Sequence, residues 1–193
     1  IIDFVKDLRD ITLKKELPSL FKDPGYTWKG NSYDLDFMCH EPQDLLSFAV
    51  PGMYIESGTS LNISVRDNGR FDAILDSKRI AFKKHYMKGF KATFDNAEST
   101  FNGRFTCDEF KVATLKMSDN SFRVYADDDH IGLGYSYDNH SELENRGEFI
   151  MNGTLSRVDD KVNLGIDIKP SSVYMNSKEW NILPSEIHLT SKD

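Results

Sequence analysis

The sequence has few cysteines, no long apolar run and only one small basic cluster, Lys83-Lys84-His85, which we interpret as a solvated edge. Cys39 and Cys107 can pair in an oxidising compartment or remain two small buried hydrophobic residues, and we expect free thiols. No apolar segment approaches the roughly 20 residues that a membrane-spanning helix needs. The net charge of -7 argues against a nucleic-acid partner, because contacts with phosphates need clustered Lys and Arg.

Motifs of catalysis and metal binding are also missing. The chain has no Gly-x-Ser-x-Gly elbow, no His-Glu-x-x-His helix, no phosphate-binding loop and no Cys-x-x-Cys pair. The acidic run from Asp127 to Asp129, followed by His130, lacks the spaced ligands and the distal Glu of a calcium loop. We therefore predict a solvated turn there, and we expect no catalytic residue, no metal site and no cofactor.

The first 32 residues predict a helix followed by a loop. Ile1, Val5 and Leu8 recur at helical spacing, and this helix should end at or before Pro18. The chain begins at Ile1 without a leader sequence, so we interpret it as a piece of a longer protein. Residues 1–32 thus form one predicted unit and residues 33–193 a second.

A short helix is predicted at about residues 42–50 of the second unit. Pro42 is acceptable at a first helical position, whereas Pro51 cannot continue a helix. A helix this short is not stable by itself and must dock its apolar side. We expect it to cap or plug an open end of the sheet.

Residues 59–137 predict a repetitive antiparallel sheet. Leu61, Ile63 and Val65 alternate with polar neighbours, and the same period of two returns in the segments that follow. Asp67-Asn68-Gly69 is a hairpin signal. Further turns are expected at 95–96, 119–120, 127–129 and 138–139, where Asp and Asn cluster. Because every connection is short, the strands should form a meander.

Glycines inside the predicted strands favour a curved sheet over a flat sandwich, because glycine lets a strand coil or bulge. They are Gly103, Gly132, Gly134, Gly153 and Gly165. We predict an all-β fold with minor helices, in which the meander curls into a trough or an open β-roll with an apolar interior. Trp180 is expected to close one end of that core rather than to bind a ligand.

The apolar phase of the strands identifies the residues that should line this interior. Periodicity alone leaves two alternatives open for them, a closed dry core and a groove open to acyl chains. The candidate lining residues are Leu61, Ile63, Val65, Phe71, Ala73, Leu75, Phe90, Phe94, Phe101, Phe105, Phe122, Val124, Leu133, Tyr135, Phe149, Met151, Leu164 and Ile166.

Three segments carry a resemblance to a known family. They are the run from Pro51 to Leu61, the strand end Tyr137-Asp138-Asn139, and the tail Trp180-x-Ile182-x-Pro184-Ser185-x-Ile187. Together they resemble the translocation and assembly module TamB of the AsmA-like group, in its Bacteroidetes form. The chain would then be an internal or near-C-terminal section of such a protein.

The resemblance implies a bridge-like protein of the cell envelope. Such a protein is anchored in the inner membrane, and its taco-like β-trough crosses the periplasm. It supports phospholipid transport and outer-membrane protein assembly, with an Omp85-type protein as partner. The alternative is a closed β-sandwich or barrel that acts as a non-enzymatic module for interaction or adhesion in the envelope.

Overall fold

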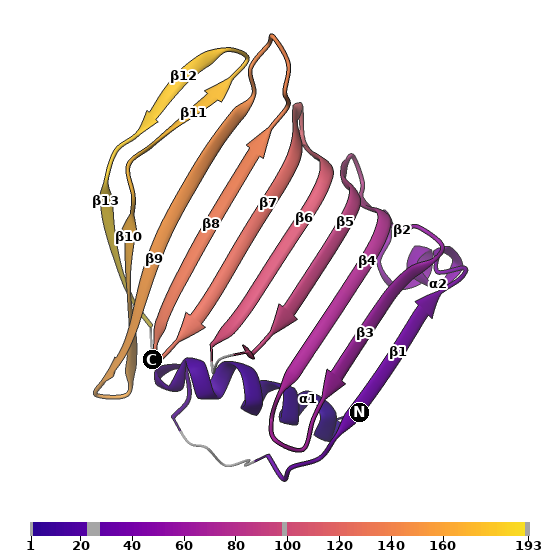
Figure 1. The fold of residues 1–193 in the computed structure, drawn as a ribbon, viewed down its shortest axis with the longest axis vertical. Helices are drawn as coiled ribbons and strands as arrows, with labels where there is room; N and C mark the ends of the chain where they lie inside the picture. The colour runs from indigo at the N-terminus through magenta and orange to yellow at the C-terminus, as the bar shows by residue number, and fades with distance from the viewer. Residues whose placement is uncertain (1, 23–27, 98–99, 192–193) are drawn as a thin grey trace.

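The computed structural model describes residues 2–22, 28–97 and 100–191. Among them, thirteen strands form one sheet that contains only antiparallel pairs, with the main order β1-β3-β4-β5-β6-β7-β8-β9-β10-β13 (Figure 1). The strands of this path are β1 (Tyr33–Cys39), β3 (Thr59–Val65), β4 (Phe71–Phe82), β5 (His85–Asp95), β6 (Phe101–Val112), β7 (Leu115–Asp127), β8 (His130–Asp138), β9 (Arg146–Val158), β10 (Lys161–Ile168) and β13 (Ser185–Thr190). The others are β2 (Met53–Ile55), which pairs with β4, and the hairpin of β11 (Ser171–Met175) and β12 (Lys178–Ile182), which pairs with β9.

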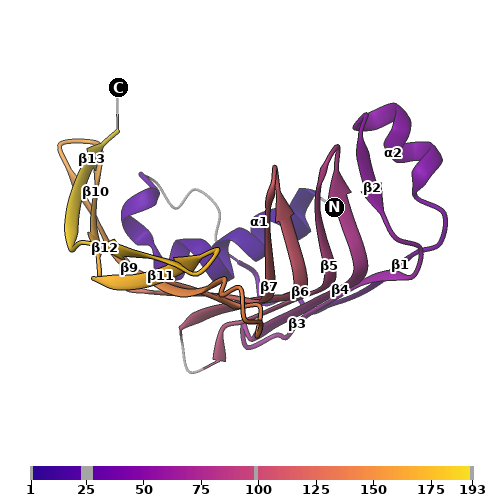
Figure 2. The same cartoon turned by 90° about the horizontal axis from the view of Figure 1, so that it is seen from above.

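The sheet is an open meander, as the alternating pattern predicts. The main path ends at β1 on one side and β13 on the other, and these two strands do not pair with each other. The closed sandwich or barrel of the alternative is therefore wrong. Figure 2 shows the sheet curved into a trough, with the ends of β4 to β7 and the pair β10–β13 standing up on the same side.

Most of the predicted turns are confirmed, but one is displaced. The β3–β4 hairpin closes at Gly69, whose φ of 79° suits glycine. The turn expected at 119–120 lies instead at Ala113-Thr114, so β6 and β7 are longer than the pattern indicated. Ala113 takes a left-handed φ of 55° there, and no turn-favouring residue marks the position.

Asp119 instead marks an interruption of the ladder that crosses four strands. The register of β4 to β7 is constant, but the rung of Lys78, Gly89, Asp108 and Asp119 is unpaired, and between β5 and β6 the next pair, Phe90 and Cys107, is unpaired as well. Gly89 and Asp119 have positive φ angles of 58° and 46°. Beyond this rung the ends of β4 to β7 stand away from the base of the sheet, so the residues around it form the inner side of a corner (Figure 2).

The helical N-terminal segment lies across one end of the concave face. It comprises α1 (Ile2–Arg9), the π-helix η1 (Asp10–Lys14) and the 3-10 turn η2 (Pro18–Leu20). Ile11 packs with Val65 and Phe71, and Leu17 packs with Ala126 and Leu155. This segment, which we call the N-terminal strap (residues 2–20), therefore spans the sheet from its β3 side to its β9 side (Figure 1).

The expectation that the short helix plugs the sheet is wrong. That helix, α2 (Gln43–Ala49), is confirmed in place, but it packs beside β2 at the margin of the sheet. Its Phe48 side chain is 88% exposed. The plug comes instead from the N-terminal strap, which has the length and the apolar side chains to reach across several strands.

Candidate apolar site on the concave face

The register places all eighteen candidate lining residues on one face. Phe105, for example, lies opposite Ala92 on one side and Phe122 on the other, and Phe122 lies opposite Tyr135. Residues that are directly opposite in neighbouring strands project to the same side of a sheet. Following the partners from strand to strand connects Leu61 on β3 with Phe149 on β9 along a single rung.

Part of this face is covered by the N-terminal strap. Val65, Phe71 and Ala73 are buried in the cluster around Ile11, and Phe94 and Phe101 pack against that cluster. Leu164 packs in the second cluster, around Leu17. These candidate residues belong to a dry core in this structure.

Another part lies beyond the strap, where an open depression of about 500 Å³ occupies the inner side of the corner. Phe90, Phe105, Phe122 and Tyr135 line it, and all four are candidate residues. The remaining lining residues are Met87, Cys107, Phe110 and Asn120. The other candidates, among them Leu133, Phe149 and Met151, are half-buried on the same face.

Sequence reasoning missed Met87, Cys107, Phe110 and Asn120 because it split the long strands at the wrong places. In a regular strand Met87 would project to the face opposite Phe90, and Phe110 to the face opposite Cys107. The interrupted rung changes this alternation, so Met87 and Phe110 pack against Phe90 and Cys107. Gly89 inside an otherwise regular strand was the one available signal of such an irregularity.

Aromatic rings form a continuous row along this face. The ring centroids of Phe94 and Phe101 are 6.0 Å apart, those of Phe94 and Phe105 are 5.1 Å apart, and those of Phe105 and Phe122 are 5.5 Å apart. These spacings are those of favourable edge-to-face and stacked pairs. The row leads from the residues under the N-terminal strap into the open depression.

Polar groups of the depression satisfy one another. The Tyr135 hydroxyl donates to Asn120 Oδ1 at 2.7 Å, and Asn120 Nδ2 donates to the Met117 carbonyl at 3.0 Å. Burial raises the pKa of Tyr135 above its ordinary value, and it raises the pKa of the Cys107 thiol to about 11. Both side chains are therefore neutral at physiological pH, and the depression offers an uncharged surface.

The N-terminal strap carries carboxylates into the interface that it makes with the sheet. Asp7 is fully buried and accepts hydrogen bonds from the Tyr33 hydroxyl and from Asn31 Nδ2. Glu16 is 2% exposed, and burial raises its pKa. Asp7 is thus paired within this interface, and Glu16 lies 3.3 Å from the Lys15 ammonium. Because burial still favours the neutral form of Glu16, the charge of that carboxylate weakens the docking of the strap.

The acidic run holds the end of the strap. Asp128 and Asp129 form the expected turn with φ angles of 44° and 64°. The Asp129 carboxylate accepts hydrogen bonds from the backbone N–H of Ser19 at 2.9 Å and from its hydroxyl at 2.8 Å. Within residues 2–22, 28–97 and 100–191, no group of three or more metal-ligating side chains is assembled.

Trp180 does not close the end of the core, contrary to the expectation. Its side chain is 49% exposed on β12, with the Lys178 ammonium 4.7 Å from the ring centroid. The β11–β12 hairpin lies off the main path of the sheet and is joined to it through the pairing of β11 with β9 (Figure 1). Both cysteines are free, as expected.

None of the helices in the described parts of the chain is both long and apolar enough to cross a membrane. Comparison with known proteins adds no family to this geometry. No family model, no curated protein and no solved structure matches the chain.

Proposed function

We propose that the chain is a section of an envelope-spanning, bridge-like protein that shelters lipid acyl chains on its concave face. The observation that carries the proposal is the open depression, into which the aromatic row continues from the residues that the N-terminal strap covers. Apolar side chains gathered in one concave depression are typical of a site for an apolar ligand.

The chemistry of the depression favours a flexible hydrocarbon. Phe90, Phe105, Phe110 and Met87 offer rings and a thioether without any charge. Each methylene removed from water contributes about 0.8 kcal/mol, so about ten methylenes of one chain supply roughly 8 kcal/mol before the cost of ordering that chain. A methionine beside five rings suits a ligand of variable shape, because its side chain adapts to irregular surfaces.

The resemblance to TamB supplies the wider context of the proposal. The whole protein would be anchored in the inner membrane through another segment, with this section in the periplasm. It would carry phospholipid, support outer-membrane protein assembly and meet an Omp85-type partner, without enzymatic chemistry or a cofactor. The trough-like open sheet supports this context, because such a carrier needs a face that is accessible from the side.

A photo-crosslinking amino acid at Phe105, compared with the same amino acid at Ile74, tests the proposal. Phe105 lines the depression, whereas Ile74 is 41% exposed on the opposite face. In bacterial cells we expect phospholipid adducts at position 105, at least tenfold more abundant than at position 74, by mass spectrometry. Equal labelling at both positions, or no lipid adduct at position 105, would refute acyl-chain shelter.

A further inference from the structure

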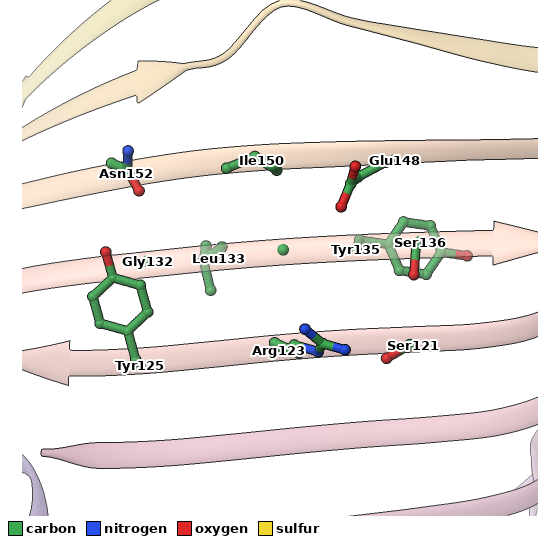
Figure 3. A pocket seen from close by; sticks show the side chains of 11 residues that line it. Ser121, Arg123, Tyr125, Gly132, Leu133, Tyr135, Ser136, Glu148, Ile150 and Asn152 are labelled. Carbon is green, nitrogen blue, oxygen red and sulfur yellow. The ribbon is translucent and has the colours of Figure 1, made fainter.

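The opposite, polar face of the sheet carries a second groove, of about 280 Å³, above β8. Gly132 and Gly134 form its floor, and side chains of β7 and β9 form its two walls (Figure 3). A Cβ atom at Gly134 would have no atom within 4 Å, so the floor is open to solvent at this point. The wall residues that matter below are Tyr125, Arg123, Ser121, Glu148 and Asn152.

Tyr125 makes a flat platform in this groove. Its ring reaches from β7 onto Gly132 of β8, where any Cβ atom would collide with it (Figure 3). The side chain is nevertheless 46% exposed. One side of the ring is thus in contact with the backbone, and the rest of the ring is open to a ligand that can stack on it.

The polar side chains of the groove have no partners among the described residues. No hydrogen bond or ion pair is made by the side chains of Arg123, Glu148 or Asn152, and Ser121 Oγ is buried without a hydrogen-bond partner. Elsewhere on the same face polar side chains do pair, as Ser64 does with Asp34 at 2.6 Å. Arg123 also lies directly opposite Arg104, which is an unfavourable arrangement of like charges.

We propose that this groove binds a saccharide chain lying along β8, with one pyranose ring stacked on Tyr125 and the hydroxyls of that ring and of the following sugars on Asn152, Arg123 and Glu148. The unpaired cation and anion decide the chemistry of the ligand, because a simple anion would suit Arg123 but be repelled by Glu148. A hydroxyl both donates and accepts, so a hydroxyl-rich ligand satisfies both groups. The carbon–hydrogen face of the sugar matches the apolar ring, and an open groove suits a chain of sugars that lies along it.

Affinity electrophoresis of the full chain tests this in gels that contain mixed-linkage β-glucan, galactomannan, xyloglucan or polygalacturonate. We expect at least one polysaccharide to retard the protein, and Gly134→Val and Tyr125→Ala each to reduce the affinity at least tenfold. A Cβ atom at position 134 meets no atom within 4 Å and valine suits a strand, so we expect Gly134→Val to narrow the groove and to keep the sheet intact. Trp180→Ala, which removes an exposed aromatic residue of β12, should leave the retardation unchanged.

Three results would each overturn the saccharide site. The first is that none of the four polysaccharides retards the protein. The second is that Gly134→Val is retarded as strongly as the unmodified chain while its thermal midpoint is unchanged. The third is that tetraalanine shifts the amide NMR signals of Gly132 and Gly134 while xyloglucan and the other polysaccharides do not, which would assign the groove to peptides.

Discussion

Replacing Ile11 with alanine should release the N-terminal strap from the sheet. Ile11 is 5% exposed and packs with Val65, Phe71 and Ala73, so its truncation removes buried methyl groups and leaves a cavity. Such changes cost about 2–4 kcal/mol. At 1.4 kcal/mol per factor of ten, the equilibrium for opening of the strap rises by roughly 30-fold to several-hundred-fold. The strap opens before the sheet unfolds because it packs on the sheet along one side only.

Hydrogen exchange measured by mass spectrometry tests the predicted opening of the N-terminal strap directly. Peptides that cover residues 2–20 should exchange faster by the stated factor, whereas peptides from β6 and β7 should be unaffected. Val5 on the same segment is 58% exposed, so Val5→Ala is the matched control and should change the free energy of opening by less than about 0.5 kcal/mol. If Ile11→Ala and Val5→Ala accelerate exchange equally, the strap is not held by its apolar contacts and the reasoning is wrong.

Three further predictions concern titrating groups. Because burial raises the pKa of Glu16, ionisation of this carboxyl opposes folding. Glu16→Gln should therefore raise the thermal midpoint at pH 7. The gain should disappear below pH 4.5, where the carboxyl is protonated in the folded and unfolded states alike. Hydrogen bonds from Lys116 and Tyr86 lower the pKa of Glu109 to about 2, so the ionised carboxylate stabilises the fold above pH 4.5 and this stabilisation is lost as the pH falls toward 2. Chemical denaturation of Glu109→Gln should show a lower free energy of unfolding at pH 7 and a smaller decrease of that free energy over the acid range. With a pKa of about 11, Cys107 is about one part in a thousand thiolate at pH 8, so iodoacetamide should modify the more exposed Cys39 first; equal rates in peptide mapping would contradict the buried placement of Cys107.

The sequence was sufficient to predict which residues share a face of the sheet, because the alternation along a strand depends only on neighbouring residues. Leu61, Ile63 and Val65 project to one side whatever the sheet does elsewhere, and so the register could unite residues as distant as Phe71 and Ile166 on one face. The meander followed from short connections. These inferences needed no knowledge of contacts between distant segments.

What sequence reasoning missed depends on contacts between distant parts of the chain. The bend arises where four strands share an interrupted rung, and of the four residues in that rung Gly89 and Asp119 have a positive φ. Aspartate tolerates the left-handed backbone conformation, which occurs in hairpin turns and in this bend alike, so the sequence alone suggested a turn at Asp119. The docking of the N-terminal strap depends on Asp129 and Ser19, which are 110 residues apart in sequence.

The two proposed sites share a strand pair but not a surface. On β7, Phe122 projects into the apolar depression, whereas its neighbour Arg123 projects into the polar groove. On β8, the Tyr135 side chain lies in the depression, whereas the neighbouring Gly134 leaves the floor of the groove open. Since adjacent residues of a strand point to opposite faces, a side chain can be changed on one face without touching the other. Loss of lipid adducts and loss of retardation by polysaccharide are therefore separable results, and the failure of one proposal leaves the other standing.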